Sequence, residues 1–197
     1  MWGSLGNNSI RIRVKPSAIA VWFCFLVFDP SIYTLLLFLS MLIHECGHLI
    51  ALCICRVRKI RLVISAFGAE INYDGYLKSC TREIFVALGG VLANLISALP
   101  VLAFGRNIET CLFFAVASLT LVFLNLIPVK GLDGAKALES FLLFYKDPDT
   151  VFGIMKTVSL LCIALLFGLS VTVLMESGFN FSLLLLTLYL SLSILGK

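Results

Sequence analysis

The sequence predicts an all-α polytopic membrane protein. Sixty per cent of the 197 residues are hydrophobic and only 13% are charged, whereas an ordinary soluble domain carries about 25% charged residues. The mean hydropathy of the chain is +1.07, and several apolar runs reach or approach the ~20 residues that a spanning helix needs. These observations exclude a soluble domain with an ordinary polar surface.

About six membrane-spanning helices are expected from these apolar runs. We expect them to form a single membrane-embedded domain over residues 1–197, with no appended soluble regulatory domain. The expected spans are Pro16–Phe28, Ser31–Cys55, Arg82–Phe104, Thr110–Pro128, Thr150–Met175 and Phe179–Leu195.

The first of these runs has a second interpretation. Arg11, Arg13 and Lys15, followed by a short apolar run, also describe a signal peptide. A signal peptide ends in small residues at its cleavage site, but this run ends in Phe-Asp-Pro-Ser. We therefore favour a retained span.

A short re-entrant β-hairpin is expected between the second and third spans. The segment Lys59–Gly75 is rich in β-forming residues and is interrupted at Phe67-Gly68 and at Asp74-Gly75. β-Formers bounded by such breaks are typical of a hairpin. A plain surface hairpin is the alternative, because β-propensity depends on context.

The basic residues predict the orientation in the membrane. Of the 15 Lys and Arg residues, all but Arg106 and Lys156 fall in the N-terminus, the second and fourth connections, or the C-terminus. An even number of spans puts these segments on one side, and basic segments favour the cytoplasm. Both termini are therefore expected to be cytoplasmic. Binding of lipid headgroups explains part of the same excess.

The second expected span carries a group of polar residues in an apolar run, His44-Glu45-Cys46-Gly47-His48. Histidines four residues apart lie on one face of a helix, so both imidazoles can reach one zinc ion. Glu45 then sits where it can take a proton from water that the metal activates. Hydrogen bonds between helices would be a simpler use for isolated polar residues, but both histidines of the chain belong to this motif.

The expected zinc site needs a third protein ligand. The chain has no third histidine, so this ligand must be a carboxylate or a thiolate. Residues 125–134, NLIPVKGLDG, supply Asp133 at the end of the fourth span. Pro128, Gly131 and Gly134 should break the helix there, and irregular backbone at membrane depth is tolerated where it lines a cavity. Asp133 could otherwise be an ordinary carboxylate that reaches water at a span end.

These motifs resemble those of the site-2 protease family of intramembrane zinc metalloproteases. The His44–His48 motif matches the first motif of the family, residues 125–134 resemble the second, and Gly90 to Asn94 is similar to its glycine-to-asparagine pattern. The resemblance implies that Asp133 is the third zinc ligand. It also implies that Asn125 is a substrate or loop contact. Asn94, and Phe67 at the break in the β-rich segment, are further expected substrate contacts.

The expected function is therefore that of a zinc metalloendopeptidase with Glu45 as catalytic base, cleaving a membrane-associated protein within the bilayer. The compact layout is most similar to the stage IV sporulation protein FB group, which implies a sigma-factor precursor as substrate and a place in the mother-cell membrane around the forespore. The resemblance also implies inhibitory or regulatory membrane proteins as partners, and no nucleic acid. A membrane zinc carrier or channel using the same ligands is the alternative.

Overall fold

A computed structural model describes residues 10–57, 60–65, 68–73, 79–105, 107–178 and 181–195. The chain forms two compact units, which are described separately: residues 1–78 with 89–121, and residues 79–88 with 122–197. In chain order the elements are β1 (Ile10–Val14), α1 (Pro16–Phe28), α2 (Ile32–Ile54), β2 (Ile60–Ser65), β3 (Gly68–Tyr73), α3 (Cys80–Phe104), α4 (Glu109–Leu126), α5 (Asp133–Leu142), α6 (Pro148–Ser177) and α7 (Ser182–Leu195).

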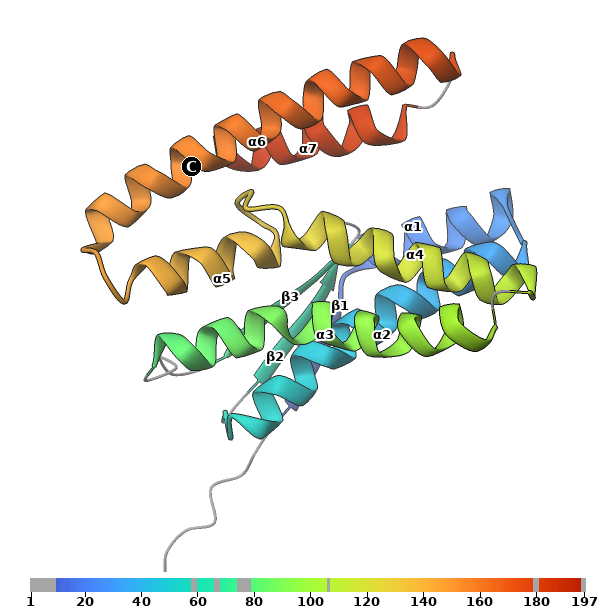
Figure 1. The fold of residues 1–197 in the computed structure, drawn as a ribbon. Coiled ribbons are helices and arrows are strands. Elements are labelled where there is room, and N and C mark those ends of the chain that lie inside the picture. The colour runs from blue at the N-terminus through green and yellow to red at the C-terminus, as the bar shows by residue number, and fades with distance from the viewer. Residues whose placement is uncertain are drawn as a thin grey trace, which may run out of the picture. The chain divides into compact units, whose positions relative to one another are not determined.

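The first unit contains a three-stranded sheet in the order β1-β2-β3 (Figure 1). Strands β2 and β3 pair antiparallel, with Ile60 opposite Tyr73 and Ser65 opposite Gly68. This is the pairing that the sequence predicts for the segment; its re-entry into the membrane stays a prediction. Strand β1 was not predicted. It pairs parallel with β2, with Ile10 opposite Ile60.

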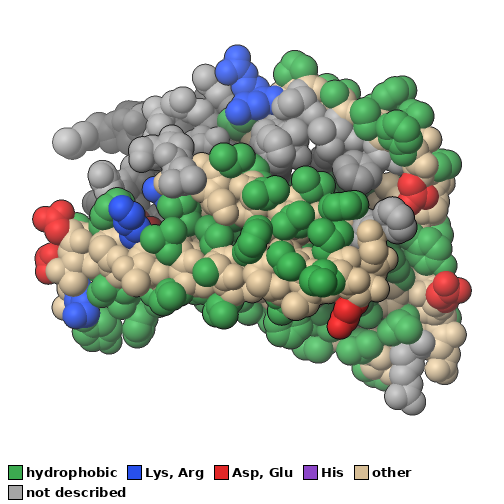
Figure 2. All heavy atoms as spheres, turned by 90° about the horizontal axis from the view of Figure 1, so that it is seen from above, with side chains coloured by type: hydrophobic (Ala, Val, Ile, Leu, Met, Phe, Trp, Pro, Cys, Tyr) green, Lys and Arg blue, Asp and Glu red, His purple; other side chains and the backbone are tan. Residues whose placement is uncertain are grey.

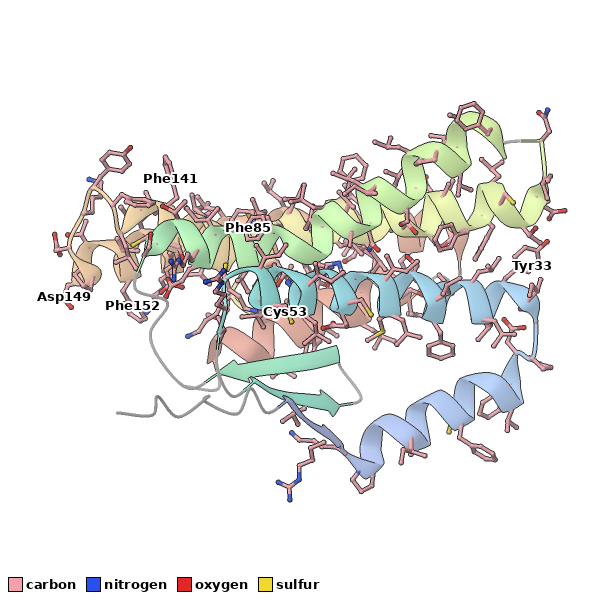
Figure 3. The ribbon with its side chains drawn as sticks, turned by 90° about the horizontal axis from the view of Figure 1, so that it is seen from below. Tyr33, Cys53, Phe85, Phe141, Asp149 and Phe152 are labelled. Atoms are coloured by element: carbon pink, nitrogen blue, oxygen red, sulfur yellow. The ribbon has the colours of Figure 1, made fainter. Side chains whose placement is uncertain are left out.

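The parallel pairing of β1 with β2 determines how α1 and α2 run. Because β1 precedes α1 and β2 follows α2, the chain leaves the sheet along α1 and returns to it along α2. Tyr33 and Cys53 mark the two ends of α2, and α1 joins α2 at the end that carries Tyr33 (Figure 3). The N-terminal strand and the connection after α2 therefore lie at the same end of this helix pair.

Both ends of α2 have local stop signals. Ser31 is the N-cap, and its side chain accepts a hydrogen bond from the backbone N–H of Thr34. At the other end Arg56 has a φ of 54°, and the N–H of Val57 donates to the carbonyl oxygen of Leu52 at 3.1 Å. This is the Schellman arrangement that terminates a helix. Ser31 and Cys55, the expected first and last residues of the second span, are thus the two capping residues of α2.

Polar contacts join α2 to α4 within the first unit. The Tyr33 hydroxyl donates to the Glu109 carboxylate at 2.7 Å, and the buried hydroxyls of Ser40 and Ser118 lie 2.8 Å apart. Hydrogen bonds of this kind join helices where the surroundings are apolar. They hold α2, which carries both histidines, against its neighbour.

In the second unit, α5 packs on α6 through a small core of Ala135, Val151 and Met155. Helix α5 falls in a segment for which no helix was predicted. Helices α6 and α7 run side by side (Figure 1). Asp147 caps the start of α6 by accepting from the N–H of Thr150.

Four helices in the described part of the chain are long and apolar enough to cross a membrane: α2, α3, α4 and α6. Hydrophobic side chains dominate the face in Figure 2, and the charged side chains gather mainly toward its ends. The chain is a membrane protein. Helices α1 and α7, with 13 and 14 residues, are shorter than the ~20 residues of a regular span, so the count of six stays a prediction.

Candidate metal centre

His44 and His48 converge on one point beside α2. Both imidazole side chains are buried, and their Nε2 atoms lie 3.2 Å apart. The ring planes stand at 81° to each other. The four-residue spacing that predicted a shared face has therefore brought the same nitrogen of each ring together.

The separation of the two nitrogens fits a zinc ion. Two Zn–N bonds of about 2.0–2.1 Å at the tetrahedral angle place their nitrogens about 3.3–3.4 Å apart. The observed Nε2–Nε2 distance of 3.2 Å is close to this value. The pair can act as two ligands of one metal with little rearrangement.

Gly90 on α3 leaves room at the same point. A Cβ atom at this position would lie 2.5 Å from Nε2 of His48 and 2.6 Å from Nε2 of His44. Any other residue would therefore occupy the space that the two nitrogens face. With glycine at position 90, no side chain from this residue blocks the two imidazole nitrogens.

A reciprocal glycine contact holds α3 this close to α2. A Cβ atom on Gly47 would collide with the carbonyl oxygen of Gly89, and one on Gly89 would lie 2.8 Å from the carbonyl oxygen of Gly47. Small residues let helix backbones approach in membranes. Gly47 therefore serves helix packing.

Asn94 is the third polar side chain of this cluster. It is 0% exposed, and its Nδ2 atom lies 3.4 Å from Nδ1 of His44. Glu45 follows His44 on α2 and is partly buried. The structure thus brings His44, His48 and Asn94 together, with Glu45 on the adjoining face of the same helix.

Asp133 belongs to the second unit, where it is the first residue of α5. Its side chain is buried, and one carboxylate oxygen lies 3.5 Å from Nζ of the exposed Lys136. Gly134 allows this position, because a Cβ atom there would collide with the carbonyl group of Leu126 at the end of α4.

The loop before Asp133 is fixed by Ser159 of α6. The Ser159 hydroxyl donates to the carbonyl oxygen of Pro128 at 3.1 Å, and its oxygen accepts from the N–H of Lys130 at 3.3 Å. Gly131 has a φ of +104°, which proline cannot adopt because its ring holds φ near −65°. Ser159 was not predicted; a lone serine in an apolar span gives no signal of such a role.

The remaining predicted residues lie elsewhere. Asn125 is on α4 in the second unit, and Phe67 lies outside the described residues.

Two imidazoles and a carboxylate are the donor set of many catalytic zinc sites. The group His44, His48 and Asp133 could hold a metal ion.

Among solved structures, the chain is similar to the site-2 protease from Methanocaldococcus jannaschii, with a TM-score of 0.67 and 18% sequence identity. The similarity covers 100% of this chain and 93% of that chain. No family model matches the sequence, and neither does any curated protein. The likeness concerns the fold: the chain is folded like this site-2 protease.

Proposed function

We propose that this chain is an intramembrane zinc metalloprotease of the site-2 type that hydrolyses a peptide bond in a membrane-associated protein. The observation that carries the proposal is the convergence of Nε2 of His44 and Nε2 of His48 at 3.2 Å beside Gly90. Two buried imidazoles whose Nε2 atoms converge on one point are the arrangement that two histidine ligands of one metal require.

In this proposal His44, His48 and Asp133 are the three protein ligands. Zinc, when bound, would polarise the scissile carbonyl and make water acidic enough to lose a proton near neutral pH. The chemistry of the donor set supports zinc, because two imidazoles with one carboxylate suit this ion. All three side chains are buried.

Glu45 would act as the catalytic base. It follows His44 on α2 and is not a member of the group that could hold the metal. It would accept a proton from the attacking water and later deliver that proton to the leaving amine. Its partial burial is compatible with a group that must meet both water and substrate.

The substrate would bind as an extended strand. Strands β1 and β3 are the two edge strands of the described sheet, and an edge strand can accept a peptide strand. Asn125, Asn94 and Phe67 are proposed to contact the substrate. Unwinding a helical substrate is required in any case, because a helix hydrogen-bonds its own peptide groups.

We propose a single membrane-embedded domain with about six spans and both termini in the cytoplasm. The parallel pairing of β1 with β2 supports placing the N-terminus and the connection after α2 on the same side. It puts Arg11 and Arg13 beside that basic connection. Lipids and inhibitory membrane proteins would be further partners. The finer proposal, a sporulation sigma-factor precursor cleaved in the mother-cell membrane, rests on the resemblance of the motifs and layout alone.

Substitution of Glu45 tests the proposal. Wild type, Glu45→Gln and the neighbouring control Cys46→Ala would each be co-expressed with membrane-tethered precursors, including a sigma-factor precursor. Loss of the base should lower cleavage by about 10²–10⁴-fold, while Cys46→Ala, an exposed position on the same helix, should cleave like wild type. Undiminished cleavage by Glu45→Gln would overturn the proposal. A membrane zinc carrier that uses the same ligands would transport equally well with either residue at position 45.

A further inference from the structure

Asn94 has a buried polar atom that substrate binding alone does not explain. The side chain is 0% exposed, and Oδ1 has no hydrogen-bond partner within the described part of the chain. A buried acceptor without a partner costs about 1–3 kcal/mol. The Nδ2 atom of the same amide lies 3.4 Å from Nδ1 of His44.

The two ring nitrogens of His44 face different neighbours. Nε2 points at Nε2 of His48, whereas Nδ1 points at the Asn94 amide. A neutral imidazole carries one N–H and one acceptor nitrogen. If Nε2 gives its lone pair to a metal, Nδ1 must carry the proton and needs an acceptor. Zinc-binding histidines usually donate this second N–H to a carboxylate, a carbonyl oxygen or water.

The Asn94 amide can supply that acceptor. Turning the amide plane by half a rotation exchanges Oδ1 and Nδ2, which are nearly equal in size. Oδ1 then faces the N–H at Nδ1 of His44 and gains the donor that it lacks. An amide also adds no charge to an apolar interior, where an aspartate would be expensive.

Helix α3 places this amide accurately. Asn94 follows Gly90 by one helical turn, so both residues lie on the face of α3 that meets the histidines. The Ser97 hydroxyl donates to the backbone carbonyl oxygen of Asn94 at 3.0 Å. The contact between Gly47 and Gly89 fixes the distance of α3 from α2.

The geometry points to Asn94 as a positioning residue for His44: its amide oxygen holds the tautomer protonated at Nδ1, which leaves Nε2 available to the metal. This inference rests on the proposed function, because it takes His44 to be a metal ligand. Asn94 itself does not bind the metal. Its role is to orient the ring and raise the basicity of the ligating nitrogen.

Zinc affinity of the full chain in detergent, measured by competition with a chelator, tests the inference. Asn94→Leu keeps the size but removes the acceptor, and should bind zinc about 10–100-fold more weakly. Asn94→Asp restores an acceptor and should recover most of the affinity. Ser118→Ala is the matched control, since Ser118 is also 0% exposed and bonds to Ser40 rather than to a histidine; its zinc affinity should equal that of wild type.

The inference about Asn94 and the metal centre itself would fail with different experimental results. Wild-type zinc affinity in Asn94→Leu, with only KM for substrate raised, would leave Asn94 with the proposed substrate contact alone and overturn the inference. Equal weakening in Asn94→Leu and Asn94→Asp, with both folded, would also overturn it. If Asn94→Leu does not fold, Asn94→Ala replaces it with the same expected loss. Unchanged zinc affinity in His44→Ala would instead refute the metal centre, whatever the Asn94 variants do.

Discussion

A Cβ atom at Gly90 would lie 2.5 Å from Nε2 of His48. This relationship ties the third helix to the motif of the second, although 41 intervening residues separate the two positions. It also explains why a residue with no side chain is needed in the middle of an apolar helix, where glycine costs about 1 kcal/mol relative to alanine.

Gly90→Ala should therefore weaken zinc binding by about tenfold or more, because the added methyl group occupies the space in front of both ring nitrogens. Gly168→Ala in α6 is the matched control, since nothing lies within 4 Å of a Cβ atom there. Chelator competition on the purified proteins measures both. Equal zinc affinity in the two variants would show that the metal lies elsewhere.

Gly131→Pro should disturb the loop that leads to Asp133. Gly131 has a φ of +104°, and proline would force a negative φ. Gly131→Ala should be milder, with backbone strain of about 1–3 kcal/mol. Zinc affinity and thermal unfolding in detergent should fall in the order wild type, alanine, proline. A proline variant with both properties unchanged would mean that this loop conformation is not needed.

The cap of α6 should make part of the stability depend on pH. Hydrogen bonds from the backbone N–H and the hydroxyl of Thr150 hold the pKa of Asp147 below its usual value. The folded state therefore favours the carboxylate. This contribution is present above the unfolded pKa of about 3.9 and is lost as the pH falls through the lower, folded pKa.

Asp147→Asn keeps a capping side chain but cannot titrate. Unfolding in detergent, followed from pH 7 down to pH 3, should show a steeper loss of stability for wild type than for this variant at the acidic end. The same pH dependence in both proteins would remove Asp147 as a cause.

The pairing of β1 with β2 can be tested by cross-linking. Arg13 and Val63 are register partners, and neighbouring strands lie about 4.8 Å apart, which is within the Cα separation of disulfides. An Arg13→Cys, Val63→Cys variant should form a cross-link on mild oxidation, detected as joined peptides by mass spectrometry. The two single variants are controls. Absence of the link would separate the N-terminal strand from the connection after α2.

The sequence predicted that His44 and His48 share one face of α2, because that geometry is local. Spacing by four residues determines which face of α2 carries His44 and His48, and Ser31 is a recognisable N-cap. Strand β1 was not predicted because Arg11 and Arg13 fit a topology signal or the start of a signal peptide, although Ile10, Ile12 and Val14 alternate with them. This alternating segment forms a strand because β2 supplies a pairing partner.

Other features depend on contacts between distant segments. The approach of Gly47 to Gly89 and of Asn94 to His44 joins residues more than 40 positions apart, which spacing cannot reveal. Helix α5 is short, and its stability depends on packing Ala135 against Val151 and Met155 of α6. The adjacent Gly89 and Gly90 in an apolar helix are a signal of close approach, but not of the partner.

The most direct test of the account is the zinc content of the purified chain after removal of loosely bound metal. Wild type and Glu45→Gln should each retain about one zinc ion per chain, as one three-ligand site requires. His44→Ala and His48→Ala should retain almost none, and Asp133→Ala should bind zinc more weakly. Full occupancy in a variant that lacks both His44 and His48 would contradict the central claim.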